Sequence, residues 1–421
     1  MKNPPRPPAS LRTEALEVSR RLAGMKFRRV FLIVLDSVGI GVMPDAPPED
    51  AGAHTLDNIC LTAGPPMAPR LMSLGLGNIE GVNCFPAAVI PEGAFGRMAE
   101  VSAGKDTTTG HWEMAGVPLD KAFPTFPGGF TEELLGAIAG AAELPGWLGN
   151  EPASGTEIIE RLGPEHIDSG KPIVYTSADS VLQIAAHEEH FGLERLLKLC
   201  ETARAMTLDL GIARIIARPF VDAPEGSEHR FQRTYNRRDF SLEPPRPTLL
   251  DQFVAQGVPV VGVGKIEDIF AGNGVSYSLH TSGNDDGMDK TCEVAEHLMA
   301  GLVFVNLVDF DMNFGHRRDP AGYRKAIEEF DVALAKLESI RREDDLFILT
   351  ADHGNDPTND KHTDHTREYV PLVAFGDRAK GGLDLGTRST FADVAATVAD
   401  VFRIDYEGAG TSFLPELLGD A

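Results

Sequence analysis

Acidic and histidine side chains gather in a few short stretches of this sequence, in a pattern that suits metal ions. Aspartates and histidines occur there in equal numbers, and they offer carboxylate oxygens and imidazole nitrogens. This donor set suits two borderline divalent cations, Mn²⁺ or Zn²⁺, each with about three protein ligands. Two such ions can activate a hydroxyl nucleophile and stabilise a phosphoryl group during its transfer. The candidate ligands are Asp36, Asp311, His316, Asp352, His353 and His365.

A simpler interpretation of these residues is a set of solvated turns, since Asp, His and Gly are common in turns. One isolated Asp-His pair would favour that interpretation. Here three apolar runs each end in such residues, and TADHGND at 350–356 is followed closely by TDHTREY at 363–369. The repetition favours a metal centre.

A second stretch, GKDTTTGHWEMAG at 104–116, carries three consecutive hydroxyl side chains between glycines. The pattern predicts a loop that leads into a helix, whose N-terminus favours an anion. Thr107, Thr108 or Thr109 could therefore be an activated nucleophile or carry a phosphate. An ordinary helix N-cap with spare threonines explains the same pattern, and the local sequence leaves both interpretations open.

The elements that position these residues are predicted by hydrophobic patterning. Residues 29–35 are apolar at nearly every position, as in a strand buried on both faces of a parallel sheet. The same construction returns at 302–311 and 345–356, and a helical pattern at 322–344 separates the two. This alternation predicts an α/β domain, in which ligands bind at the carboxyl ends of the strands.

The composition changes between residues 121 and 245, a stretch with proline-rich borders and apolar runs of its own. We interpret it as a domain inserted into a metal-binding core formed by residues 25–120 and 246–421. Residues 1–24 begin with a proline-rich segment, and we expect them to form a mobile N-terminal extension without a chemical role.

Charge and cysteine content exclude several classes of function. Asp and Glu number 63 against 39 Lys and Arg, and a net charge of -24 disfavours binding to nucleic acid or to anionic membranes. No apolar run approaches the ~20 residues of a membrane span. The four cysteines are far apart in the sequence, which predicts buried free thiols and a cytoplasmic protein.

Two weaker motifs carry no predicted chemistry. His187 and His190 are three residues apart, whereas the HExxH zinc pattern needs four, so we expect them on a helix surface or at a hinge. The GVGK stretch at 262–265 is followed by Ile266, where a nucleotide-binding loop needs Ser or Thr.

Eight stretches of the sequence match one family closely. They are VLDSVGIG, GKDTTTGHWE, PASGTEI, YTSADSVLQIAAHEE, RIIARPF, VGKIEDIF, NLVDFDMNFGHRRDP and TADHGNDP with TDHTREYVPL. From about Met25 to the C-terminus, the chain resembles the phosphopentomutases of the alkaline phosphatase superfamily. The resemblance implies an α/β fold with an alkaline-phosphatase-like core, whose largely parallel sheet is flanked by helices, and an inserted α+β cap domain.

The same resemblance implies roles for single residues of the core. Thr107 would be the residue that is phosphorylated in the active enzyme. Two Mn²⁺ ions would be bound, with other divalent cations as alternatives. The ligands would be Asp311, His316 and His365 for one ion, and Asp36, Asp352 and His353 for the other.

In the inserted region, the resemblance implies a cap that closes over a sugar phosphate. Arg237 would bind the distal phosphate, and Lys265 would reach in from the core. Substrate contacts are further implied for Ser177, Asp179, Arg214 and Ile216. The chain departs from the family at Arg238, where a histidine is common, and its loop between Asp356 and Asp364 looks about one residue longer.

The implied activity is the interconversion of ribose 1-phosphate, or 2-deoxyribose 1-phosphate, and the 5-phosphate. It would run through phosphothreonine and a 1,5-bisphosphate, which also serves as activator. One alternative is another metal-dependent phosphatase or phosphosugar mutase of the superfamily, including a phosphoglycerate mutase that uses serine. A non-catalytic, metal-dependent binding protein is a second alternative. Small sugar phosphates are the expected partners, and the oligomeric state is left open.

Overall fold

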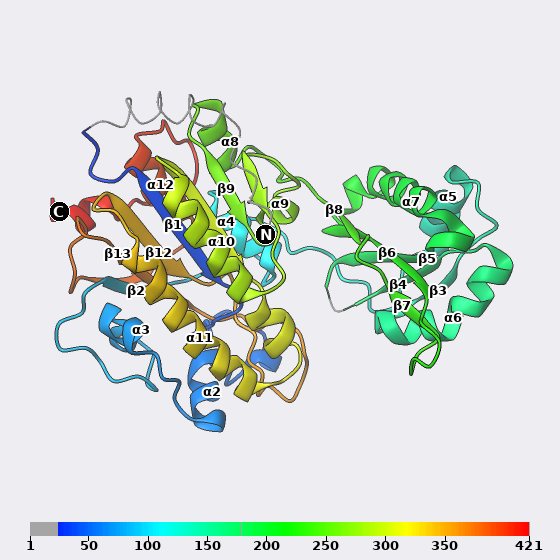
Figure 1. The fold of residues 1–421 in the computed structure, drawn as a ribbon, viewed down its shortest axis with the longest axis horizontal. Helices are drawn as coiled ribbons and strands as arrows, with labels where there is room; N and C mark the ends of the chain where they lie inside the picture. The colour runs from blue at the N-terminus through cyan, green and yellow to red at the C-terminus, as the bar shows by residue number, and fades with distance from the viewer. Residues whose placement is uncertain (1–23, 178, 421) are drawn as a thin grey trace. The chain divides into compact units, whose positions relative to one another are not determined.

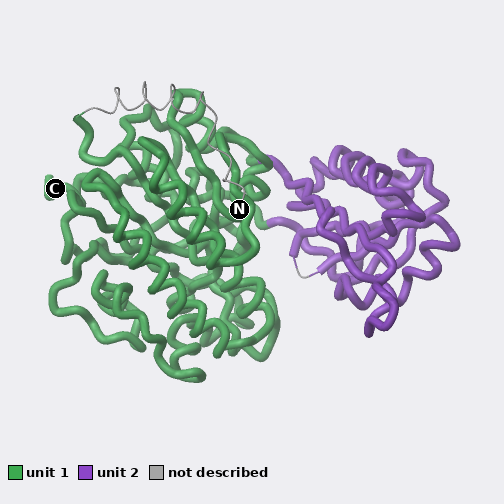
Figure 2. The backbone as a smooth tube through the Cα atoms, in the orientation of Figure 1, with its two compact units in different colours: residues 1–122, 244–421 green, residues 123–243 purple. Residues whose placement is uncertain are grey.

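The computed structural model describes residues 24–177 and 179–420, and these form two compact units. Unit 1 comprises Met1–Ala122 and Pro244–Ala421, and unit 2 comprises Phe123–Glu243 (Figure 2). The boundaries expected for the inserted domain, residues 121 and 245, lie two residues outside those of unit 2. Apart from Gly24, the predicted N-terminal extension lies outside the described residues.

Unit 1 is built on an eight-stranded sheet, seen at the left of Figure 1. Neighbouring strands are parallel from β10 to β12, whereas β13 is antiparallel to both β12 and β2. β14 is parallel to β2. The strands, in spatial order, are β10 (Tyr277–Leu279), β9 (Val260–Val263), β11 (Gly301–Leu307), β1 (Arg29–Leu35), β12 (Asp345–Thr350), β13 (Val370–Phe375), β2 (Ala94–Met98) and β14 (Asp384–Arg388).

The three central strands position the acidic residues. Every residue of β11, β1 and β12 is buried, because helices cover both faces of the sheet. Val34 pairs with Asn306 on one side and with Thr350 on the other. The three strands therefore end at the same edge, and the residues that follow them meet there.

Two groups of helices pack against this sheet. In the first, α10 and α11 lie side by side, and α11 also contacts α2 and α3 (Figure 1). In the second, α4 contacts α9 and α12. The elements of unit 1 besides the strands are η1 (Pro48–Asp50), α2 (Thr55–Ala63), α3 (Pro69–Leu74), η2 (Leu76–Asn78), α4 (Thr107–Met114), α8 (Leu249–Ala255), α9 (Ile266–Ile269), α10 (Asn284–His297), η5 (Phe310–Gly315), α11 (Pro320–Ser339), α12 (Ala392–Phe402) and α13 (Leu414–Leu418).

The helix predicted at 322–344 begins earlier and ends earlier in the structure. Asp319 caps its N-terminus by accepting a hydrogen bond from the backbone N–H of Gly322, and Pro320 occupies the first turn. The helix ends at Ser339, and Asp345 already opens β12. None of the helices in the described ranges combines the length and apolar character of a membrane span.

Unit 2 has a six-stranded sheet of mixed direction with helices on both faces. One apolar cluster packs α5 and α7 against the sheet, and a second packs α6 against it. Its elements are α5 (Glu132–Ala141), β3 (Leu148–Pro152), α6 (Gly155–Ser169), β4 (Ile173–Thr176), β5 (Val181–His187), η3 (Glu188–Gly192), α7 (Leu193–Met206), η4 (Leu208–Leu210), β6 (Arg214–Asp222), β7 (Phe231–Arg233) and β8 (Arg238–Ser241).

The expected fold class is confirmed, since a largely parallel sheet flanked by helices forms the core and a separate α+β unit is inserted into it. The expectation for the cysteines is wrong for two of the four. Cys60 and Cys84 form a disulfide with their Cα atoms 6.0 Å apart, whereas Cys200 and Cys292 are buried free thiols. The carboxylate of Asp57 accepts hydrogen bonds from the backbone N–H groups of Asn83 and Cys84, which holds their loop against α2.

Candidate metal centre

The candidate ligands of unit 1 lie at the edge where the central strands end. Asp36 follows β1 directly, and Asp352 and His353 follow β12. Asp311 lies in η5, the π-helical turn that comes just after β11. All four side chains are buried, so their charges are removed from bulk water. Buried carboxylates at this density need compensation by a cation or by protons.

Asp36, Asp352 and His353 form the first group of donors. The Nε2 atom of His353 lies 3.4 Å from Oδ1 of Asp36 and 3.5 Å from Oδ2 of Asp352. Asn306 donates to the other oxygen of Asp36, and the Ser37 backbone N–H donates to the other oxygen of Asp352. Both oxygens that face His353 are buried. Oδ1 of Asp36 has no hydrogen-bond partner within residues 24–177 and 179–420, and Oδ2 of Asp352 lies 3.2 Å from Nδ1 of His111.

Asp311, His316 and His365 form a second group beside the first. Nε2 of His316 lies 3.1 Å from Oδ2 of Asp311 and 3.2 Å from Nε2 of His365. Nε2 of His365 lies 3.5 Å from Oδ1 of Asp311. The rings of His353 and His365 stack with their centroids 4.0 Å apart, so the two groups adjoin.

Backbone carbonyls orient two of these imidazoles. Nδ1 of His353 lies 3.1 Å from the Gly354 carbonyl, and Nδ1 of His316 lies 2.7 Å from the Thr363 carbonyl. A carbonyl only accepts, so each Nδ1 carries a proton, and each Nε2 faces the acids as the atom that a cation would bind. This is the arrangement of histidines that ligate metals.

Asp36 and Asp311 have pKa values shifted in opposite directions, because their charged neighbours differ. Burial raises the pKa of Asp36 well above its usual value, and the negative charges of Asp352 and Asp311 raise it further. Burial also acts to raise the pKa of Asp311, but the neighbouring His365 and His316 outweigh it and hold that pKa well below its usual value. A divalent cation between such groups would relieve the repulsion that Asp36 experiences. The residues present therefore fit metal ions on both geometry and charge.

The threonine loop meets the first group at the N-terminus of α4. Asp106 is the N-cap, and its carboxylate accepts from the backbone N–H groups of Thr108 and Thr109. The hydroxyl of Thr107 lies 3.2 Å from Nε2 of His353. An aspartate therefore performs the capping role, and Thr107 is the threonine whose hydroxyl contacts the candidate ligands.

Three neighbours of the site were not predicted from the sequence. Nδ1 of the buried His111 lies 2.8 Å from the Thr107 carbonyl and 3.2 Å from Oδ2 of Asp352. Asn355 donates to Asp311 over 2.7 Å, and Asn306 donates to Asp36 as described above. His111 stands four residues after Thr107 in the same motif, and this helical spacing is a signal that could have indicated it.

Lys265 is the one predicted substrate contact in unit 1. It is the N-cap residue of α9, at the end of β9, and its positive charge acts to lower the pKa of Asp36. That electrostatic effect places Lys265 near the first group of donors, on the same edge of the sheet.

The other predicted substrate contacts lie in unit 2. Arg214 opens β6, 3.6 Å from Asp179, and Arg237 binds Asp239 through two hydrogen bonds of 2.7 Å. Asp239 also lies 3.9 Å from Arg214, so the structure brings these charged residues together. Ser177 follows β4, Ile216 is buried within β6, and the guanidinium of Arg238 stacks on Phe240.

His187 and His190 were expected at a helix surface or hinge. Nδ1 of His187 accepts hydrogen bonds from the backbone N–H groups of Glu189 and His190, which caps η3. Their side chains and Asp222 place possible ligand atoms within 4.8 Å of one another. However, the capping bonds occupy the Nδ1 lone pair and leave the proton on Nε2, which disfavours a metal there.

The comparisons with known proteins agree on one assignment. Residues 28–406 match the profile of the Metalloenzyme superfamily. A phosphopentomutase from Symbiobacterium thermophilum is 52% identical over 392 residues, which cover 93% of this chain and 98% of that protein. A phosphopentomutase from Alkaliphilus oremlandii is 51% identical over 387 residues, covering 91% and 98%. The chain belongs to the phosphopentomutase family.

Members of the phosphopentomutase family are isomerases, and this chain is an enzyme of that class, an intramolecular phosphotransferase. The superfamily assignment further makes it a metalloenzyme with an alkaline-phosphatase-like core. Among solved structures, the PH0037 protein from Pyrococcus horikoshii matches with a TM-score of 0.48 and 16% identity, covering 91% of this chain and all of that one.

Proposed function

We propose that this enzyme interconverts ribose 1-phosphate, or 2-deoxyribose 1-phosphate, and the corresponding 5-phosphate. The observation that carries the proposal is the position of the Thr107 hydroxyl. It lies 3.2 Å from His353, beside a buried oxygen of Asp36 that has no partner among the described residues. A hydroxyl placed there is suited to accept and return a phosphoryl group. The names of the close relatives support a pentose phosphate as substrate.

The six candidate ligands are proposed to hold two Mn²⁺ ions. Asp36, Asp352 and His353 would hold one, and Asp311, His316 and His365 the other. Bound there, the ions would lower the pKa of the attacking hydroxyl and neutralise charge on the phosphoryl oxygens. Asn306, Ser37 and Asn355 fix the carboxylates that face them, so the donor atoms are preorganised.

In the proposed cycle, phosphorylated Thr107 donates its phosphoryl group to the C5 hydroxyl of ribose 1-phosphate. The bond from phosphorus to Oγ1 breaks, a bond to the C5 oxygen forms, and the proton of the C5 hydroxyl passes to the released Oγ1; the return step moves a proton from Oγ1 to the C1 oxygen. The resulting 1,5-bisphosphate reverses in the site and returns its C1 phosphoryl group to Thr107, which releases the 5-phosphate. Arg214, Arg237 and Lys265 would bind whichever phosphate is not reacting.

Unit 2 is proposed to act as the cap that keeps water from the phosphorylated threonine. A mutase must return the phosphoryl group to the sugar, and exclusion of water prevents its loss as inorganic phosphate. The identity of the metal, the bisphosphate activator and a cytoplasmic location stay predictions. The free-thiol argument for that location applies only to Cys200 and Cys292.

The deciding experiment supplies Mn²⁺-loaded enzyme with ribose 1-phosphate and a catalytic amount of ribose 1,5-bisphosphate. We expect ribose 5-phosphate to accumulate without stoichiometric inorganic phosphate. Release of inorganic phosphate without ribose 5-phosphate would instead identify a phosphatase. Intact-mass and peptide analysis should locate one added phosphate on Thr107, which disappears in Thr107→Ala and persists in the neighbouring control Thr108→Ala.

A further inference from the structure

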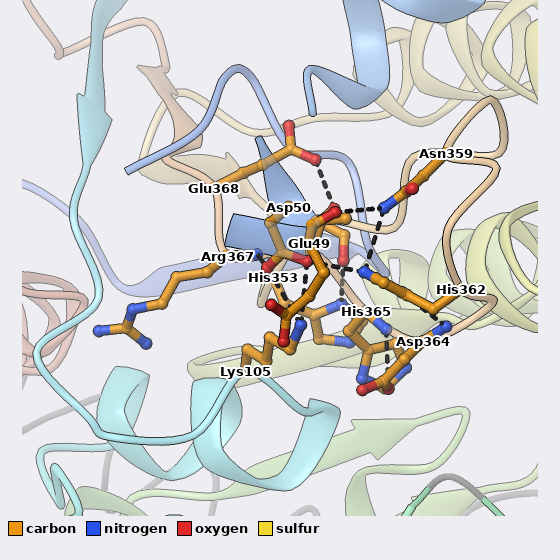
Figure 3. Close-up of polar contacts among 12 residues, drawn as sticks. Glu49, Asp50, Lys105, His353, Asn359, His362, Asp364, His365, Arg367 and Glu368 are labelled. Atoms are coloured by element: carbon orange, nitrogen blue, oxygen red, sulfur yellow. Dashed lines mark hydrogen bonds and ion pairs between the residues drawn. The ribbon is translucent and has the colours of Figure 1, made fainter. Parts of the chain in front are cut away.

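Asp50 is a buried acid that joins three segments of unit 1. It lies at the end of η1 and is fully excluded from solvent. Its carboxylate accepts hydrogen bonds from Nζ of Lys105 over 3.0 Å and from the backbone N–H of Arg367 over 2.9 Å. Nε2 of His362 lies 2.9 Å from it as well. Figure 3 shows Lys105, His362 and Arg367 gathered around this carboxylate.

His362 acts as a donor to Asp50. Its Nδ1 accepts a hydrogen bond from the backbone N–H of Asp364, so the proton lies on Nε2, the atom that faces Asp50. The same loop is bound to η1 at a further point, because Nζ of Lys361 donates to the Pro48 carbonyl over 3.2 Å.

Arg367 extends the connection to the segment that leads into the threonine loop. Its buried guanidinium binds the Asp45 carboxylate with two hydrogen bonds of 2.9 and 3.0 Å. It also donates to the carbonyls of Glu100, Ser102 and Gly104 over 3.0, 2.9 and 2.7 Å. Such a planar fork fixes the direction of every partner, which a lysine could not reproduce.

Asp50 and Arg367 therefore connect the threonine loop to the loop that carries His365. Lys105, bound by Asp50, is two residues before Thr107, whereas Arg367 is two residues after the candidate ligand His365. The side chains of Asp50 and Arg367 are themselves buried, and each is bound by several partners, which restricts their movement. A displacement of about 1 Å between reacting groups can cost roughly 100-fold in rate.

We propose that Asp50 and Arg367 are positioning residues that fix the threonine loop relative to the loop that carries His365. The proposal rests on the proposed function of Thr107 as phosphoryl acceptor. Neither residue contacts the reacting atoms in this role, so each acts through the loops that it holds. A buried ion pair that only stabilises the fold is the competing explanation.

Asp50→Asn tests the proposal, because it keeps the shape of the side chain and removes its charge. We expect kcat to fall about 10- to 100-fold, with KM for the sugar phosphate and the bound metal unchanged. Transfer from ribose 1,5-bisphosphate to Thr107, followed by intact mass, should slow by the same factor. Arg367→Lys should show the same pattern, since it keeps the charge and loses the fork.

Asp345→Asn is the matched control for a purely structural effect. Asp345 binds Arg29 in a buried pair with two hydrogen bonds of 2.6 Å, at the end of β12 opposite to Asp352. We expect it to lower the melting temperature and to leave kcat per folded molecule unchanged. If Asp50→Asn behaves like this control, the positioning proposal is wrong.

His362→Leu decides the question if Asp50→Asn does not fold. It removes the donor that faces Asp50, which a glutamine could replace, and leaves Asp50 and Arg367 in place. We expect a fall in kcat and in the rate of Thr107 phosphorylation without loss of metal. Unchanged rates would overturn the proposal. The wild-type enzyme separates this outcome from a failure of the proposed function. If wild-type protein never becomes phosphorylated on Thr107, the proposed function itself is wrong.

Discussion

The side chains at the metal centre are only partly satisfied by the protein. One oxygen of Asp36 is bound by Asn306 and one oxygen of Asp352 by the Ser37 backbone. In the described part of the chain, the other oxygen of Asp36 has no partner, and the other oxygen of Asp352 has only His111 nearby, at 3.2 Å. Buried polar atoms are nearly always hydrogen-bonded, so the oxygen of Asp36 that faces the centre is suited to a cation. Hydrogen bonds from the protein therefore fix these carboxylates, and their oxygens that face the centre are the atoms that a cation would bind.

Substitution of Asp311 should remove one of the two proposed ions. Asp311→Ala takes away the carboxylate that lies between His316 and His365, and we expect bound metal to fall by about one equivalent. Elemental analysis after dialysis measures this directly. Asp309→Asn is the matched control, because this acid lies two residues earlier and binds the Asn284 backbone instead. Full metal occupancy in Asp311→Ala would refute the ligand assignment.

We expect His111 to raise the metal affinity of the site without ligating an ion itself. Its Nδ1–H faces the Thr107 carbonyl and Asp352, and its ring stacks on Phe304 with centroids 5.5 Å apart. His111→Phe keeps a stacking ring and removes the donor, and we expect metal affinity to fall roughly 10- to 100-fold. Metal titration followed by activity and by calorimetry measures the change.

Trp112→Phe is the matched control for the His111 variant. Its indole N–H donates to the Ile269 carbonyl, away from the candidate ligands, so its loss should affect stability alone. Equal metal affinities in both variants and in the wild type would show that His111 is only a core residue.

At the scale of elements, the sequence predicted the strands and the edge at which they end. The run at 30–35, apolar at every position, is a strong signal because a strand buried on both faces of a parallel sheet requires such a run. Parallel direction then puts Asp36, Asp311 and Asp352 at one edge, and the order β11-β1-β12, which the sequence did not predict, makes them neighbours. For this reason, the site residues that directly follow strands could be predicted from the sequence.

The residues that hold these ligands in place could not be predicted in the same way. Asp50 stands in the stretch PPEDAG, which reads as a solvated turn, yet it is buried by contacts with residues 55 and more than 300 positions away. The Cys60–Cys84 disulfide was missed for a similar reason, since Asp57 and not the cysteine spacing brings that loop to α2. Long-range hydrogen bonds to loops leave no periodic pattern in a sequence.

His166 of α6, which contacts the residue that caps η3, should make the stability of unit 2 depend on pH. Nδ1–H of the buried His166 donates to the Lys171 carbonyl over 2.6 Å, and its Nε2 accepts from the His187 backbone over 2.9 Å. Nε2 can accept only while the ring is neutral, and burial lowers the pKa of His166. On unfolding this pKa returns to its ordinary value of about 6.5, so the unfolded chain takes up a proton that the folded chain does not.

We therefore expect the stability of unit 2 to be full above about pH 6.5 and to fall as the pH is lowered from there, by at most about 1.4 kcal/mol per pH unit for this group. Hydrogen exchange at the His187 amide, compared at pH 7.5 and 5.5, reports on the unit directly. His166→Gln should flatten the dependence, whereas the exposed His229→Gln should not. A wild-type slope in His166→Gln would exclude this histidine as the cause.

At the scale of the whole molecule, the two units differ in the charged side chains proposed to act in the reaction. Unit 1 contains the six candidate ligands and Thr107, whereas unit 2 carries an arginine cluster that pairs in part with Asp239. Burial and then the charge of Arg237 lower the pKa of Arg218 to about 10, and Arg233 contributes to the same effect. In a protein with a net charge of -24, this cationic group is the feature suited to a phosphate that is not reacting.

Substitution of Arg237 should therefore separate binding from chemistry. Arg237→Met removes the guanidinium proposed to hold the distal phosphate, so we expect KM to rise and more phosphoryl groups to be lost to water. Bound metal and phosphorylation of Thr107 by saturating bisphosphate should stay at wild-type levels, because those functions belong to unit 1. The ratio of inorganic phosphate to ribose 5-phosphate measures the loss. Arg195→Met removes another arginine of unit 2, one that stacks on Phe191, and should leave this ratio unchanged. An unchanged ratio and KM in Arg237→Met would contradict the division of roles between the units.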